Sequence, residues 1–271
     1  MPRVLLPLLL AALAVFALGC QESGFDENKE TSKPLKVQHA LGESKVPGQA
    51  EQPMTLTVDT LDDTLALGVR PARAAVPGAR LPAYLREAGR GVSLMAPVTA
   101  SDLAAVEAVH PDLILGSAER QGKLYEDLSR IAPTVMTDGG GGQWKLNLRL
   151  VGEGMGRTND AEALLTDYDR EAAQARRAIP GRPSVAVVRA TAGGLRAAPR
   201  DSFAGTILAD AGVRQVSDLA AADALLLSSA PGAKAHLDGS FTRADDALWW
   251  GAGGALAARA ALDDLRAAFS G

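Results

Sequence analysis

The segment WKLNLRLVGEGMGRTNDAEALLTDYDREAAQARRAI, residues 144–179, decides how the rest of the chain is arranged. Its apolar residues recur at the three- and four-residue spacing of a helix face, and Pro180-Gly181 ends the pattern. Gly156 divides it into a short helix and a longer one, and Asn159 with Glu162 is expected to begin the longer helix as a capping box. About 20 helical residues span roughly 30 Å. The segment is therefore predicted to connect two parts of the molecule.

Strand-like and helix-like segments alternate on both sides of this helical region. Residues 112–115 form an apolar strand pattern before it, and residues 184–188 and 223–227 do so after it. Such alternation predicts parallel sheets that helices cover on both faces. The predicted fold is α/β, with two lobes of mostly parallel sheet joined by a single long helix. The predicted boundaries are 36–142 for the N-terminal lobe, 143–180 for the helical linker and 181–271 for the C-terminal lobe.

The first 19 residues have the pattern of a secretory signal peptide, with Arg3, an apolar run over residues 4–18 and small residues before Cys20. The Gly19-Cys20 pair, which contains the single cysteine of the chain, resembles a bacterial lipobox, whose cysteine is lipidated and becomes the mature N-terminus. A plain secretory peptide with an incidental cysteine is the alternative. Residues 20–35 are polar and are predicted to be a flexible tether. We therefore expect a lipid-anchored protein on the extracytoplasmic face of the cell membrane.

The charge and the motif content argue against several functions. The chain has 28 Lys and Arg against 32 Asp and Glu, and it has no basic block of the kind that nucleic-acid binding requires. Its three histidines, His39, His110 and His236, are far apart, so no metal-ligand spacing is present. No G-x-S-x-G or H-E-x-x-H motif occurs. We expect neither an enzyme nor a nucleic-acid-binding protein.

Short blocks along the mature chain resemble the solute-binding proteins of ABC importers, and within them the ferric-siderophore branch. Each block is weak alone, but their number and order make the resemblance specific for the family. They are HALG (39–42), LALGVRP (65–71), PDLILGS (111–117), YEDLSRIAPTV (125–135), WKLN (144–147), VVR (187–189), DSFAG (201–205), DDALW (245–249) and ALDDL (261–265).

The resemblance implies a monomeric protein that binds a ferric siderophore between its two lobes and delivers it to a permease. The siderophore itself holds the Fe³⁺, so the protein needs neither metal ligands nor a covalently bound cofactor. Family members dock through one glutamate on each lobe. The first position corresponds to Ala104, with Glu107 three residues later, and Asp218 is the carboxylate nearest to the second position. The C-terminal lobe is also shorter than is usual in the family.

A siderophore cleft needs aromatic surface for the apolar parts of the ligand and cationic groups for its oxygens. Arg189 ends an apolar strand, where parallel sheets expose binding residues, and it lies close in sequence to Arg196 and Arg200. The other candidates are aromatic or cationic residues expected at the linker, beside the glycine-rich segment 251–254 and in the first lobe. The predicted ligand-binding residues are Trp144, Lys145, Arg189, Arg196, Arg200, Trp249, Trp250 and Tyr84.

Two alternatives stay open from the sequence. The first keeps the class and changes the ligand to haem or a corrinoid, although no axial His, Tyr or Met can be placed in the cleft. The second is a diverged lipoprotein that kept the two-lobe scaffold and lost transport. Ala104 and the short C-terminal lobe motivate this second alternative.

Overall fold

The computed structural model describes residues 33–233, 240–251 and 253–269. The predicted signal peptide, the lipidation site Cys20 and most of the predicted tether lie outside these residues. The described part belongs to one compact unit, Ser32–Gly271. Within it, no helix is both long enough and apolar enough to cross a lipid bilayer.

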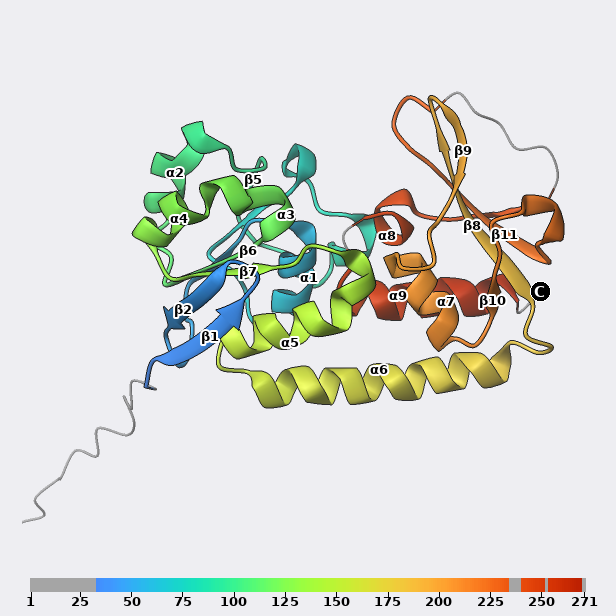
Figure 1. Ribbon diagram of the computed structural model, residues 1–271, viewed down its shortest axis with the longest axis horizontal. Coiled ribbons are helices and arrows are strands. Elements are labelled where there is room, and N and C mark those ends of the chain that lie inside the picture. Colours follow the sequence, from blue (N-terminus) through green and yellow to red (C-terminus); the bar gives the residue numbers. More distant parts are fainter. Residues whose placement is uncertain (1–32, 234–239, 252, 270–271) are drawn as a thin grey trace, which may run out of the picture. The chain divides into compact units, whose positions relative to one another are not determined.

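The N-terminal lobe is built on a parallel sheet with the strand order β5-β4-β3-β6-β7 (Figure 1). All residues of β6 are buried, as expected for a strand in a sheet that is covered on both faces. The strands are β3 (Pro53–Thr55), β4 (Arg73–Ala75), β5 (Leu94–Met95), β6 (Leu113–Ser117) and β7 (Thr134–Thr137). The helices are α1 (Val58–Ala66), α2 (Leu103–Glu107), α3 (Ala118–Gln121) and α4 (Tyr125–Ile131), with the 3-10 turns η1 (Pro77–Ala79), η2 (Ala83–Leu85), η3 (Ala100–Asp102) and η4 (Gly122–Leu124).

An antiparallel hairpin of β1 (Leu35–His39) and β2 (Gly42–Val46) precedes this sheet. The Ser44 hydroxyl donates a hydrogen bond to the Thr134 carbonyl at 2.7 Å, which attaches the hairpin to β7. Leu35, which the sequence places in the tether, is the first residue of β1.

The C-terminal lobe contains a second, mostly parallel sheet with the order β10-β8-β11-β12. The short strand β9 pairs with β8 in the antiparallel direction. Between α7 and β11 the chain forms only β10 and one 3-10 turn, η6 (Leu219–Ala221). The elements are β8 (Ser184–Thr191), β9 (Gly194–Ala197), α7 (Phe203–Asp210), β10 (Arg214–Gln215), β11 (Ala224–Ser229), β12 (Thr242–Arg243), α8 (Asp246–Trp249) and α9 (Ala255–Ala268).

Two helices connect the sheets: α5 (Trp144–Gly154), preceded by the 3-10 turn η5 (Gly141–Gln143), and the 21-residue α6 (Thr158–Ala178). Gly156 lies between them with φ 68°, and a Cβ at this position would collide with the Gly48 carbonyl. The expected capping box at Asn159 is wrong, because α6 begins one residue earlier and has no side-chain cap. Glu162 instead accepts hydrogen bonds from Arg149 of α5, at 2.6 and 3.2 Å.

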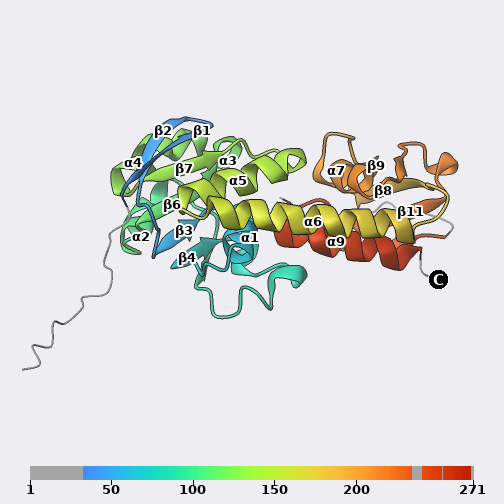
Figure 2. The same cartoon turned by 90° about the horizontal axis from the view of Figure 1, so that it is seen from below.

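One hydrophobic core runs from the first sheet through the connecting helices into the second sheet. Leu113 of β6, Leu148 of α5, Tyr168 of α6, Val185 of β8 and Leu262 of α9 all belong to it. Helix α6 lies alongside α9 (Figure 2). The continuous core explains how residues that are far apart in sequence are held at fixed positions around the site.

Helix α9 also contacts α1 of the first lobe through buried carboxylates. Asp62 accepts hydrogen bonds from the backbone N–H groups of Leu256 and Ala257, and Asp63 accepts one from Ala255. A Cβ at Gly254, just before α9, would collide with Asp62, so glycine permits this close approach. The first turn of α9 is thereby capped by side chains from another element.

Candidate functional site

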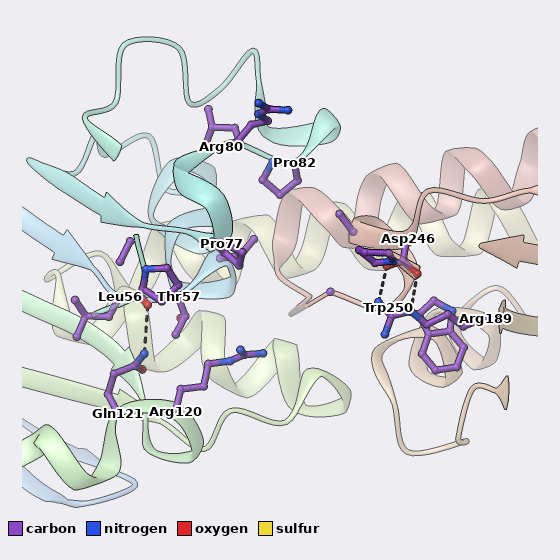
Figure 3. Close-up of a pocket in the computed structure, with 17 residues that line it drawn as sticks. Leu56, Thr57, Pro77, Arg80, Pro82, Arg120, Gln121, Arg189, Asp246 and Trp250 are labelled. Carbon is purple, nitrogen blue, oxygen red and sulfur yellow. Dashed lines mark hydrogen bonds and ion pairs between the residues drawn. The ribbon is translucent and has the colours of Figure 1, made fainter. Parts of the chain in front are cut away.

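A cavity of about 450 Å³ lies between residues of the two lobes (Figure 3). Its walls are largely apolar, and a few polar and charged side chains project from them. The apolar and glycine residues that line it are Leu56, Val58, Ala75, Pro77, Leu81, Pro82, Pro97, Pro231, Ala247 and Gly251. A cavity of this size and composition is typical of a small-molecule site.

The cavity lies at the carboxyl ends of strands in both sheets. In the first sheet the connections leave β3 towards β4 on one side, whereas β6 lies on its other side, so the strand order reverses between β3 and β6. In the second sheet the corresponding reversal falls between β8 and β11. Thr57 follows β3, Arg120 follows β6, and Arg189 lies near the end of β8. Ligands bind at such reversals because the diverging connections leave a crevice there.

The first lobe contributes Thr57, Arg80, Arg120 and Gln121 to the cavity. Gln121 accepts a hydrogen bond from the Ser117 N–H at 3.1 Å and donates one to the Leu56 carbonyl at 3.4 Å, so it holds the loops after β6 and β3 together. Arg120 extends from α3 towards the side of the cavity that carries Arg189 and Trp250 (Figure 3). Its guanidinium is thereby available to a ligand.

The second lobe contributes a joined group of polar and aromatic side chains. Arg189 donates two hydrogen bonds to Asp246, from Nε to Oδ1 at 2.7 Å and from Nη2 to Oδ2 at 2.6 Å. Ser228 donates a third hydrogen bond to Asp246 Oδ1 at 3.0 Å. The Arg189 guanidinium lies 5.8 Å from the centroid of the Trp250 ring, within the range of a cation–π contact. Among the described residues, the buried Nε1 of Trp250 has no hydrogen-bond partner.

Of the sequence-predicted binding residues, the structure brings Arg189 and Trp250 into this cavity. Trp144 and Lys145 do not line it. The Trp144 ring is 2% exposed and packs edge-on against Tyr168, with ring centroids 4.7 Å apart. Lys145 Nζ forms ion pairs with Asp169 and Asp210, each at 3.1 Å. We therefore assign both residues to the contact between α5, α6 and α7, where Trp144 packs in the core and Lys145 forms ion pairs.

The remaining predicted residues also lie outside the cavity lining. Trp249 is buried and donates its Nε1–H to Asp264 at 3.1 Å, and Arg200 donates to the Gln215 carbonyl at 3.2 Å. Tyr84 packs against the core, and burial followed by the nearby Asp62 carboxyl raises the pKa of its hydroxyl. Arg196 is exposed on β9, directly opposite Arg189 in the strand register.

Sequence reasoning missed Arg80, Arg120 and Asp246. The signal for Arg120 was present, because it lies shortly after the apolar strand 113–117, just as Arg189 lies near the carboxyl end of the strand 184–191, and the same rule on strand ends applies to both. Asp246 was visible only as part of the DDALWW segment. Its role depends on the parallel pairing of β12 with β11, which no local pattern reveals. Arg80 lies in an irregular loop and carried no signal.

Resident metal ligands are not assembled in the described part of the chain. No group of three or more His, Cys, Asp or Glu residues there is positioned to hold a metal ion. Among the residues that the structure describes, no His, Cys, Met or Tyr lines the cavity.

The comparison with protein families assigns the class. The family model of the periplasmic binding proteins matches residues 55–232, which is more than half of the chain, and this protein belongs to that family. The matched range runs from the end of β3 to the loop after β11 and includes the first-lobe side of the cavity and Arg189.

A curated relative supports this assignment. The probable siderophore-binding lipoprotein YfiY of Bacillus subtilis (strain 168) is 30% identical over 212 residues, which cover 76% of this chain and 65% of YfiY. The chain therefore spans slightly less than two thirds of the length of that relative.

Solved structures show the same fold. Staphylococcus aureus SirA complexed with staphyloferrin B has a TM-score of 0.71 at 24% identity, covering 85% of this chain and 97% of SirA. The petrobactin-binding protein YclQ of Bacillus subtilis has a TM-score of 0.73 at 19% identity, covering 88% and 99% of the two chains. The predicted α/β fold with two lobes is thus confirmed.

Proposed function

We propose that this protein binds a ferric siderophore in the cavity between its lobes and delivers it to the permease of an ABC importer. Lipid attached at Cys20 would hold it on the extracytoplasmic face of the membrane. The observation that carries the proposal is the cavity itself. It combines an apolar wall, an indole and guanidinium groups where the strand order of both sheets reverses.

Family membership and the properties of relatives support this function. Members of the family are periplasmic binding proteins, YfiY is described as a probable siderophore-binding lipoprotein, and SirA was solved with staphyloferrin B bound. Chelating oxygens of a siderophore suit guanidinium donors, and its apolar parts suit Trp250 and the prolines of the cavity wall.

The decisive experiment is a calorimetric titration of the full lipidated chain in detergent. The panel comprises ferric hydroxycarboxylate, catecholate and hydroxamate siderophores, each beside its iron-free form. We expect one ferric complex per protein to bind with a dissociation constant in the micromolar range or tighter, and iron-free forms to bind more weakly. If no ferric complex in the panel binds, the proposal is wrong.

Haem is a less suitable ligand for this cavity. Haem proteins hold the iron through an axial His, Cys, Met or Tyr, and none of these lines the cavity within the described residues. We therefore expect no shift of the Soret band when haem is added to the protein. A shift that a ferric siderophore reverses by competition would favour the haem alternative.

Delivery to a permease is proposed to use Glu107 and Asp218. Both are exposed, Glu107 at the end of α2 and Asp218 before η6, where it also accepts the Ala220 N–H. The variants Glu107→Gln and Asp218→Asn are expected to lower cellular uptake of the bound ligand while its affinity stays unchanged, and the exposed Glu126→Gln serves as the control. Uptake that does not depend on this protein at all would favour the diverged, non-transport alternative.

The lipid anchor has its own test. Metabolic labelling with a fatty acid is expected to mark the unaltered protein and to leave Cys20→Ser unlabelled and released from the membrane. Labelling of the Cys20→Ser variant would show that the anchor was assigned to the wrong residue.

A further inference from the structure

The charges of the cavity are distributed unequally between its two sides. Of the described residues, three arginines and one aspartate line it, giving these lining residues a formal net charge of +2 in a chain whose net charge is −4. The aspartate, Asp246, is already bound in a bidentate ion pair by Arg189. The excess positive charge therefore belongs to the first-lobe side, to Arg80 and Arg120.

Neither Arg80 nor Arg120 has an ion-pair partner among the described residues. Both side chains are exposed, so water solvates their guanidinium groups until a ligand arrives. The Asp59 carboxyl, buried at the start of α1, interacts electrostatically with Arg120. Burial raises the pKa of the Asp59 carboxyl, and hydrogen bonds from Thr57 and the backbone, followed by the charge of Arg120, offset part of this rise. Asp59 is not part of the cavity lining. The N–H groups of both guanidinium groups are thus available to hydrogen-bond a ligand that enters the cavity.

Arg189 differs from these two in what it can offer. Asp246 occupies its Nε–H and Nη2–H, the edge that would otherwise grip a carboxylate with two parallel hydrogen bonds. Its guanidinium lies beside the Trp250 ring instead. The second-lobe side therefore presents a locally neutral, flat surface, whereas the first-lobe side presents two charged hydrogen-bond donors.

We propose, on the basis of the function proposed above, that the cavity selects ferric chelates of net negative charge. The anionic oxygens of the chelate bind Arg80 and Arg120, and a less charged part of it lies against Arg189 and Trp250. Guanidinium groups match anionic oxygens in both charge and geometry, whereas a positively charged chelate would be repelled by the net charge of the walls.

A charge series of ligands tests the selection directly on the full chain. Ferric citrate and ferric enterobactin are negatively charged, ferrichrome is uncharged and ferrioxamine B is positively charged. We expect at least one of the negative complexes to bind about tenfold or more tightly than the uncharged and positive ones, and its affinity to fall as salt is raised. Equal or tighter binding of ferrichrome or ferrioxamine B overturns the charge selection and leaves the proposed function intact. Failure of every complex to bind overturns the proposed function itself.

Substitutions locate the selecting residues. Arg80→Gln and Arg120→Gln are each expected to weaken binding of the negative complex about tenfold or more, because each removes a charge-assisted hydrogen bond. Each is also expected to flatten the salt dependence. Arg86→Gln removes an exposed arginine of the same lobe that does not line the cavity, and it is expected to change neither quantity. Unchanged affinity and salt dependence in both cavity variants, with melting temperatures preserved, would overturn the assignment. The ligand series on the unaltered chain decides the selection even if a variant fails to fold.

Discussion

The Asp62 carboxylate of α1 accepts the backbone N–H of Leu256 at the start of α9 at 2.7 Å, across 194 positions of sequence. The other oxygen of the same carboxylate accepts the Ala257 N–H at 2.9 Å. A helix begins with backbone N–H groups that lack partners within the helix, and a carboxylate satisfies them while also interacting favourably with the helix dipole. This contact joins the first lobe to the last helix of the chain.

Replacing Asp62 with Asn is expected to destabilise the protein by about 1–3 kcal/mol, because an amide NH₂ would face one of the buried N–H groups and leave it unsatisfied. Chemical denaturation of the two proteins at pH 5 measures the difference, because the contribution of Asp62 falls as the pH rises towards its raised pKa. Glu107→Gln is the control, since Glu107 is exposed. Equal stability of Asp62→Asn and the unaltered protein would mean that these hydrogen bonds contribute no net stability.

The same carboxylate predicts a pH dependence of stability. Burial, supplemented by repulsion from Asp59 and partly offset by the α9 N–H groups, raises the pKa of Asp62 to about 7. Burial, followed by Asp62, raises the pKa of Asp63 as well. The folded protein therefore binds protons that the unfolded chain, with Asp pKa values near 3.9, has released. This contribution to stability is complete below about pH 4 and is lost as the pH rises through about 7.

Measuring the unfolding free energies of the unaltered protein and of Asp62→Asn between pH 5 and pH 8 tests whether the contribution of Asp62 falls as the pH rises. Their difference is expected to narrow as the pH rises, by at most about 1.4 kcal/mol per pH unit for one group. Burial lowers the pKa of His39, so its contribution to stability grows as the pH rises. His39 is present in both proteins, and its contribution cancels in the difference. A gap that widens with pH would contradict the raised pKa of Asp62.

The adjacent tryptophans Trp249 and Trp250 are expected to respond in opposite ways to substitution. Trp249 is 2% exposed, so Trp249→Ala should cost about 3–5 kcal/mol of stability through the cavity that it leaves. Trp250→Ala should cost much less stability and weaken ligand binding about tenfold, because its ring lines the site. Thermal melting and calorimetric titration of both variants separate the two roles. Loss of affinity with Trp249→Ala alone would reverse the assignment.

Lys145 is expected to matter for stability and not for ligand affinity. Its ion pairs with Asp169 and Asp210 are partly solvated, with 29% of the Lys145 side chain exposed, so Lys145→Ala should cost only about 0.5–1 kcal/mol. Titration with the ligand that binds the unaltered protein is expected to return the same dissociation constant. A tenfold loss of affinity would restore Lys145 as a binding residue.

The sequence predicted the fold well because its signals were local and strong. The apolar run of β6, the apolar run of β8 and the helical spacing over residues 144–179 each specify one element with little competition. The capping of α6 failed for a physical reason. Glu162 has a better partner in Arg149, whose guanidinium reaches it from α5, and sequence spacing cannot show that contact.

The residues that line the cavity were harder to predict than the fold, because they depend on which strands are neighbours. The sequence placed Arg189 at the site because it lies near the end of an apolar strand, and the structure places it in the cavity wall. Its partner Asp246 is 57 residues away, and it is brought close by the pairing of β8, β11 and β12. Trp144 and Lys145 have the residue types expected of a ligand site, but Trp144 is buried in the core and Lys145 forms ion pairs with two carboxylates. Residue type alone does not tell whether an aromatic or cationic side chain lines the cavity or packs and pairs elsewhere.

The unequal burial of the three tryptophans makes the fluorescence of Trp250 a probe of the cavity. Trp144 and Trp249 are each 2% exposed, and each lies in a core position away from the cavity, whereas Trp250 forms part of its wall. A Trp250→Phe variant would keep the two buried emitters as an internal reference. Subtracting its emission spectrum from that of the unaltered protein would isolate the fluorescence of a single indole in direct contact with the site.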